Sequence, residues 1–74
     1  MSLEMWTVYD HPADYPDHYV ARKWLVGKKY AEPEATDEIL IDADLDELRK
    51  RIPPWLYCMP RQEGDDSKIV EVWF

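Results

Sequence analysis

Cysteine and glycine are both scarce in this sequence. Cys58 is the only cysteine, so the chain can form no internal disulfide and has no cysteine-rich zinc pattern. Gly27 and Gly64 are the only glycines, which argues against a glycine-rich phosphate loop. A lone thiol beside apolar neighbours is either a small hydrophobe or a reactive group, and the first role is the more common. This cysteine usage is typical of a reducing compartment, and we expect a cytoplasmic protein.

Long apolar runs are also missing. No run approaches the roughly 18 residues that a membrane-spanning helix requires, and the N-terminus lacks the pattern of a signal peptide. We therefore expect no membrane segment. The strand pattern starts at a second methionine, Met5. Residues 1–4 are interpreted as an expression-derived or disordered lead, and residues 5–74 as a single domain.

Basic residues are outnumbered, with nine Lys and Arg against sixteen Asp and Glu and a formal net charge of −7. Nucleic acids and anionic membranes are bound by clustered basic side chains, so we expect neither partner. A basic group near Trp24 is the one place that resembles a single-strand site, and the total charge opposes it. That group consists of Arg22, Lys23, Lys28 and Lys29.

The acidic residues are concentrated in a stretch without Lys or Arg. Its members are Glu32, Glu34, Asp37, Glu38, Asp42, Asp44, Asp46 and Glu47. Such a stretch is either a solvated face that aids solubility or the surface of an acidic inhibitor that mimics nucleic acid.

Apolar residues make up 46% of the chain and aromatic residues 14%, which indicates a folded protein. Its 74 residues suffice for one small domain. Residues 19–26 form the longest unbroken segment of aromatic and β-branched residues, and we predict that they are a central strand. Residues 5–9 are predicted to pair with them in antiparallel fashion, across a stiff connection formed by residues 10–18.

Three further strands are predicted. Residues 37–41 contain a short β-branched run, and residues 55–59 and 68–74 are expected to form a hairpin. In the last strand, alternation predicts that Val70, Val72 and Phe74 face the core. The other set, Ile69, Glu71 and Trp73, then lies on the opposite face of the strand.

One short helix is predicted after Asp44, which has the spacing of a helix cap to Glu47. Leu45, Leu48 and Ile52 make one apolar stripe, and prolines stop the helix after residue 52. The fold class is therefore α+β: a mostly antiparallel sheet of four to five strands with one short helix, in the order ββ(β)αββ.

The helix is too short to cover all the large aromatic side chains. These are Trp6, Tyr9, Tyr19, Trp24, Trp55, Tyr57 and Trp73. We infer either a partly exposed aromatic face that serves as an interface, or a face covered by long basic side chains and loops. The interface would join a protein partner or a second copy of the chain.

The connection at residues 10–18 contains both histidines and three carboxylates. These side chains serve a turn, recognise a ligand, or bind a metal ion, and the first role is the most common for such residues in a loop. Their spacing matches no known metal signature, and we expect no metal and no cofactor. The candidate contact residues are His11, Tyr15, His18, Arg22 and Trp24.

Several segments resemble a family of small bacterial and phage-borne proteins to which no activity is assigned. They are Trp6-Thr7-Val8-Tyr9, His11-Pro12, Asp14-Tyr15-Pro16, Tyr19-Val20-Ala21-Arg22 with Trp24, Asp46-Glu47-Leu48-Arg49 with Pro53-Pro54, and Ile69-Val70-Glu71-Val72-Trp73. The resemblance covers nearly the whole chain after Met5. It implies a compact bacterial or phage protein and implies neither a reaction nor functional residues.

No catalytic set stands out, because Ser67 is predicted in a turn and Cys58 has no histidine nearby in sequence. We therefore expect a non-catalytic interaction module or small homodimer. The alternatives are a small-molecule or metal-binding protein that uses residues 10–18, and an acidic inhibitor that mimics nucleic acid.

Overall fold

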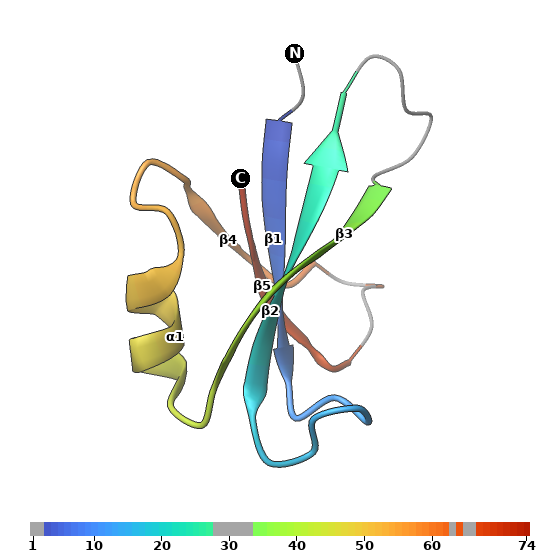
Figure 1. Cartoon of the computed structure of the whole chain (residues 1–74), viewed down its shortest axis with the longest axis vertical. Coiled ribbons are helices and arrows are strands. Elements are labelled where there is room, and N and C mark those ends of the chain that lie inside the picture. Colours follow the sequence, from blue (N-terminus) through green and yellow to red (C-terminus); the bar gives the residue numbers. More distant parts are fainter. Residues whose placement is uncertain (1–2, 28–33, 63, 65–66) are drawn as a thin grey trace.

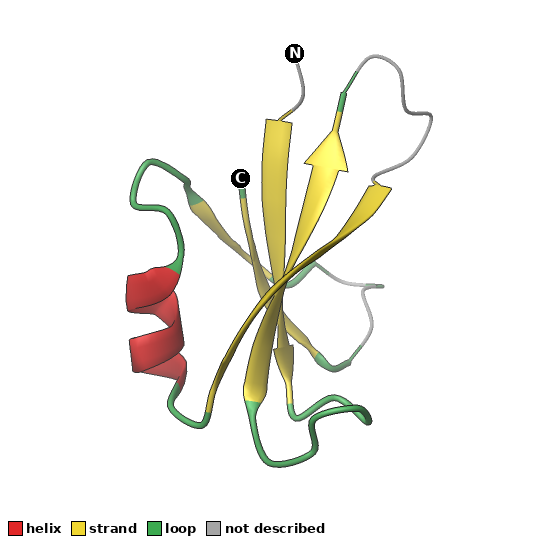
Figure 2. Cartoon of the chain, in the orientation of Figure 1, coloured by secondary structure: helices red, strands yellow, loops and turns green. Residues whose placement is uncertain are grey.

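The computed structural model describes residues 3–27, 34–62, 64 and 67–74. Its elements are β1 (Leu3–Asp10), β2 (Tyr19–Val26), β3 (Glu34–Asp42), α1 (Leu45–Arg51), β4 (Cys58–Pro60) and β5 (Ile69–Trp73). They form one strongly twisted sheet with the helix along one side (Figures 1 and 2). The predicted α+β class and the element order ββ(β)αββ are confirmed.

The five strands are arranged in the order β3-β2-β1-β5-β4. Each neighbouring pair is antiparallel, as predicted for the first two strands and for the final hairpin. The last strand of the chain therefore lies between the first strand and β4. Because β1 and β5 come from opposite ends of the sequence, their pairing joins the two halves of the domain in one sheet.

The predicted boundaries differ from the observed ones mainly at β3 and β4. β2 matches the prediction, whereas β3 begins at Glu34 and includes part of the acidic stretch. The Thr36 hydroxyl donates to the Lys23 carbonyl at 3.0 Å, where the register between β2 and β3 shifts. This side-chain bond helps to hold polar residues in an edge strand. Residues 28–33, which include Glu32 of the acidic stretch and Lys28 and Lys29 of the basic group, lie outside the described residues.

The prediction of a strand over residues 55–59 is wrong at its start. Strand β4 covers only Cys58–Pro60, and the Leu56 N–H donates to the Pro53 carbonyl at 3.2 Å to form a turn. Prolines fix φ and cannot donate to a ladder, so the chain needs this turn before it can enter the sheet. Trp55 belongs to the turn and not to the strand.

Helix α1 begins where the cap predicts. The Asp44 carboxylate accepts hydrogen bonds from the backbone N–H groups of Asp46 and Glu47 at 2.8 and 3.4 Å. Leu48 and Ile52 are buried, and they form the main core with Trp6, Val8 and Ala21. Leu45 packs against the same core. The predicted apolar stripe therefore attaches the helix to the sheet.

Candidate protein interface on the open face of the sheet

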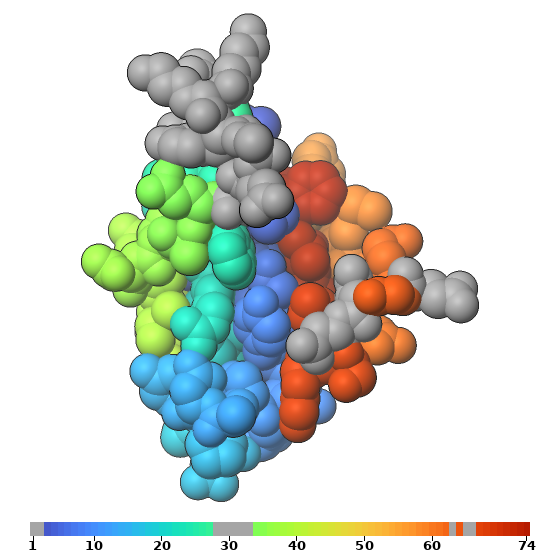
Figure 3. All heavy atoms as spheres, turned by 90° about the vertical axis from the view of Figure 1, so that its right-hand side faces the viewer, coloured from blue at the N-terminus to red at the C-terminus, as the bar shows by residue number. Residues whose placement is uncertain are grey.

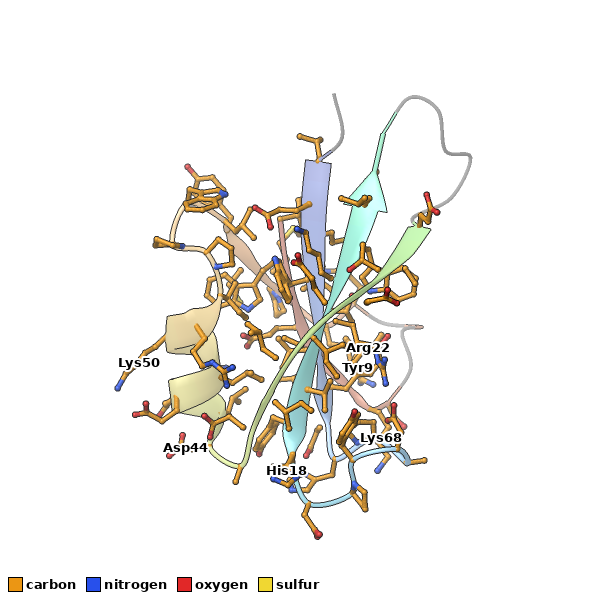
Figure 4. All side chains as sticks on the ribbon, in the orientation of Figure 1. Tyr9, His18, Arg22, Asp44, Lys50 and Lys68 are labelled. Atoms are coloured by element: carbon orange, nitrogen blue, oxygen red, sulfur yellow. The ribbon has the colours of Figure 1, made fainter. Side chains whose placement is uncertain are left out.

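Strand β2 has two chemically different faces, and the register settles which of them meets the helix. Ala21 is opposite Val8 and lies in the core with Leu48, so the face containing Ala21 is the helix face. Side chains alternate along a strand, so Arg22 and Trp24 lie on the opposite side, which we call the open face. Figure 4 shows Arg22 and Tyr9 on the side of the sheet away from Lys50 of the helix.

Large apolar side chains are exposed at one end of the open face. The exposed fractions are 66% for Leu3, 81% for Tyr57, 41% for Met59 and 52% for Phe74. We call these four residues the apolar patch. The other end of the open face, towards the loop at residues 10–18, is closed, because Val20 is fully buried there.

The ladder places the patch residues on one face. Tyr57 and Phe74 exchange two backbone hydrogen bonds of 2.9 and 3.0 Å, so they lie directly opposite each other. Met59 is opposite Val72, which is opposite Thr7. Trp73 is opposite Trp6, so continuing the register of β1 and β5 by one residue sets Phe74 opposite Met5. On its other side, Met5 is opposite Trp24 of β2. Figure 3 views this face, with the red C-terminal residues between blue β1 and orange β4.

Trp55, although 70% exposed, lies outside the patch. Its indole Nε1 donates to the Glu4 carboxylate at 3.1 Å, and Glu4 alternates with Leu3 towards the helix face. The predicted aromatic excess is therefore distributed differently from the expectation. Trp6, Tyr19 and Trp73 belong to or pack against the core, whereas Phe74, predicted to face the core, is exposed.

The loop at residues 10–18 is built from local turns. His11 adopts a left-handed backbone with φ of 48°, and its N–H donates to the His18 carbonyl at 3.1 Å. The Tyr15 N–H donates to the Pro12 carbonyl at 2.9 Å, and the Tyr15 carbonyl accepts from His18 at 3.2 Å. Histidine is among the residues that tolerate this backbone region best. The backbone of His11 therefore has a structural role in closing the loop.

Two of the loop carboxylates are paired with basic side chains. Asp10 contacts the His11 ring, whose other neighbour is the Tyr19 ring at a centroid distance of 5.0 Å. Asp14 is paired with Arg22. Among the described residues, no three His, Cys, Asp or Glu side chains lie close enough together to hold a metal ion. The metal-binding form of the loop hypothesis thus has no ligand cluster among these residues to support it.

The five predicted contact residues belong to two regions. His11, Tyr15 and His18 lie in the loop, and Arg22 is joined to them through Asp14. Trp24 lies one row closer to the apolar patch, opposite Met5. Its Nε1 is buried and has no hydrogen-bond partner in the part of the chain that the structure describes. None of the four patch residues was predicted as a contact, although Tyr57 was named among the excess aromatic side chains.

Glu71 is buried on the helix face, whereas alternation predicted that the other set of this strand, with Val72 and Phe74, faces the core. Only 4% of the residue is exposed, and its carboxylate accepts from Arg49 Nε at 3.0 Å and Nη2 at 2.6 Å. Trp73 Nε1 donates to it at 2.6 Å. These bonds compensate for the loss of water around the charge. They also tie α1 to β5.

The pKa values around Glu71 fit a structural role. Burial acts to raise the pKa of Glu71, but the hydrogen bonds from Arg49 and Trp73 outweigh it and hold the pKa below 4.5. The bond to Glu71 in turn raises the pKa of Arg49. Burial, and then the Glu71 carboxylate, raise the pKa of the Cys58 thiol. Cys58 is therefore a protonated thiol at neutral pH, which is a poor nucleophile.

The acidic stretch is less separate from basic residues than its sequence suggests. Lys23 Nζ lies 3.1 Å from Glu38, and Lys50 Nζ lies 2.9 Å from Glu47. Arg51 lies close to Asp42, and Arg49 lies close to Asp46. Cations from β2 and α1 thus offset part of the negative charge of this region.

No protein-family model, curated protein or solved structure matches the chain. None of the helical residues that the structure describes forms a segment with the length and apolarity needed to span a membrane.

Proposed function

We propose that the protein is a non-catalytic interaction module that binds another protein chain through the open face of its sheet. The observation that supports this proposal is the apolar patch, in which four large apolar residues are 41% to 81% exposed. Contiguous exposed apolar surface of this kind on a small domain tends to mark an interface. The patch residues also lie on a sheet, whose ladder holds them in fixed positions before a partner arrives.

The chemistry around the patch favours binding over catalysis. Tyr57, Met59 and Phe74 offer broad apolar contact, a type of surface that is common in the centre of protein interfaces. On the helix face, the buried carboxylate of Glu71 is paired with the partly exposed guanidinium of Arg49. Its hydrogen bonds are therefore used to hold the helix to the sheet.

A photo-crosslinking amino acid at residue 57 tests the proposal in host cells. We expect the protein to crosslink to a discrete partner from residue 57 and not from residue 55. Trp55 is the matched control, because it is an aromatic residue of similar exposure outside the patch. Equal crosslinking from both positions, or none from residue 57, would contradict the proposed role of the open face.

A second candidate function is binding of a basic partner through the acidic edge of the sheet. Glu34 and Asp37 are exposed on β3, which is an edge strand, and both belong to the acidic stretch. Such binding weakens steeply as salt is added, because exposed charges are screened. Binding that resists salt would rule out this mode.

A further inference from the structure

We infer that the partner of the open face is a second copy of this chain, packed face to face about a two-fold axis at the β5–β4 end of the sheet. This inference rests on the proposed function, since it names the partner of the same surface. In such an arrangement the apolar patch of each copy covers that of the other, so one patch is both sides of the interface.

The exposed area is sufficient for a small stable interface. Given that a large aromatic side chain has roughly 150–250 Å² of surface, the four patch residues at their exposed fractions present on the order of 500 Å². Two copies together would bury about 1,000 Å², which is about the lower limit for a specific interface. The half-buried neighbours Met5, Trp24 and Val72 add to this area.

The charge distribution also favours this face. Two copies with a net charge of −7 repel each other, so the surface of contact must lack acidic groups. The three rows of the open face that contain the patch are Leu3-Val26, Trp24-Met5-Phe74-Tyr57 and Arg22-Thr7-Val72-Met59. They hold one charged residue, Arg22, which is paired with Asp14. Contact through these rows brings no side-chain carboxylate of the rows against another.

The edges of the sheet are poor places for a second copy to bind. Because Tyr57 is a hydrogen-bonded pair with Phe74, alternation turns the backbone of Cys58 and Pro60 towards the free edge of β4. Proline has no N–H to donate, so this short edge offers a single donor. The opposite edge strand, β3, exposes Glu34 and Asp37, which repel the same residues of another copy. Face packing avoids both obstacles.

Light scattering coupled to size-exclusion chromatography tests the inference on the purified chain. We expect the mass to rise from one chain to two as the concentration goes from micromolar to millimolar. The substitution Tyr57→Ser should weaken the dimer about tenfold or more, because it removes a central aromatic anchor. The matched control Trp55→Ser should leave the dimer unchanged. Phe74→Ser provides a second patch variant, and circular dichroism verifies that each variant is folded.

Two results would overturn the inference. One is a mass of a single chain at millimolar concentration, and the other is equal weakening by Tyr57→Ser and Trp55→Ser. The first result leaves the proposed function standing if residue 57 still crosslinks specifically to a host protein. If residue 57 crosslinks to nothing and the purified chain is a monomer, both proposals fail.

Discussion

Glu71 shows at the scale of one residue how a charged side chain is kept inside a small sheet. Its carboxylate accepts three hydrogen bonds, two from Arg49 and one from Trp73. Alternation along β5 suggested the opposite orientation for this strand, because a charged residue between valines is normally solvent-facing. The partner that reverses this preference is 22 positions away on the helix, so it could not be identified from the pattern of the strand alone.

Glu71 should make stability depend on pH in the acid range. Its pKa is lower in the folded state than the ordinary value of 4.5, so its stabilising effect is present above that pH. The effect is lost as the pH falls through the folded pKa. We expect Glu71→Gln to lower the free energy of unfolding by about 1.5–3 kcal/mol at neutral pH, with a smaller difference from wild type below pH 4.5. Urea unfolding over a pH series measures this.

Glu47→Gln is the control for that experiment, because Glu47 forms an exposed ion pair with Lys50. Exposed pairs contribute little, so this variant should stay within about 1 kcal/mol of the wild type. A difference for Glu71→Gln that does not shrink in acid would contradict the assigned pKa direction.

Trp24 and Trp73 should respond differently to the same substitution. Trp73→Phe removes the hydrogen bond to Glu71 and should cost about 1.5–3 kcal/mol of stability. The buried Trp24 Nε1 has no partner among the described residues, so Trp24→Phe removes an unsatisfied donor. Removing this donor offsets part of the stability that is lost with the smaller apolar surface of Phe. We therefore expect the free energy of unfolding to change by no more than about 1 kcal/mol. Thermal unfolding of both variants compares them, and equal losses would contradict the assignment.

At the scale of elements, local rules predicted the structure where the deciding groups are close in sequence. Residues close in sequence determine the Asp44 cap and the apolar stripe of Leu48 and Ile52. The same is true of strand β2. The start of β4 and the sides of the sheet that Glu71 and Phe74 face were not predicted correctly, whereas Val70 packs against the core as predicted. Both depend on distant contacts: Tyr57 pairs with Phe74, and the ladder between β1 and β5 shifts register between Val8 and Tyr9.

The same distinction applies to the candidate interface. The excess of aromatic residues predicted an exposed aromatic face, and Arg22 and Trp24 lie on the open face. The particular residues of the patch follow from the strand order, in which the C-terminal strand lies beside β1. Leu3 belongs to β1, although the sequence placed the strand start at residue 5. Met1 and Ser2 of the expected lead lie outside the described residues.

Removing the helix cap should destabilise the element that covers the core. Asp44→Ala loses both bonds to the first turn of α1 and should lower the free energy of unfolding by about 1 kcal/mol. Asp46→Ala is the control, because Asp46 makes one long contact with Arg49 at 3.4 Å and does not cap the helix. Urea unfolding at neutral pH measures both. A larger loss for the control would show that charge, and not capping, dominates at this end.

At the scale of the whole molecule, net charge opposes self-association. Each chain carries a formal net charge of −7, and cations near the acidic stretch offset it only locally. The proposed dimer and the alternative basic partner therefore have opposite salt dependences. Screening reduces repulsion between copies, whereas it weakens attraction between an acidic surface and a basic one.

Raising the salt concentration should strengthen the dimer. We expect the dissociation constant to fall several-fold between about 0.01 and 0.1 M salt, as the Debye length shortens from about 30 to about 10 Å. Light scattering at fixed protein concentration follows the change. Association that weakens with salt would indicate attractive charge contacts and would contradict packing through the uncharged patch.

The position of β5 also affects how the protein is made in the cell. Ile69–Trp73 forms the strand between β1 and β4, so the sheet has a gap in its interior until these residues are available. During translation they remain in the ribosomal tunnel after β1 and β2 have emerged. The nascent chain would then expose the β1 edge and the side chains of Trp6 and Val8. The sheet is expected to be completed only after residues 69–73 leave the tunnel, and until then the emerging hairpin is a natural substrate for chaperones.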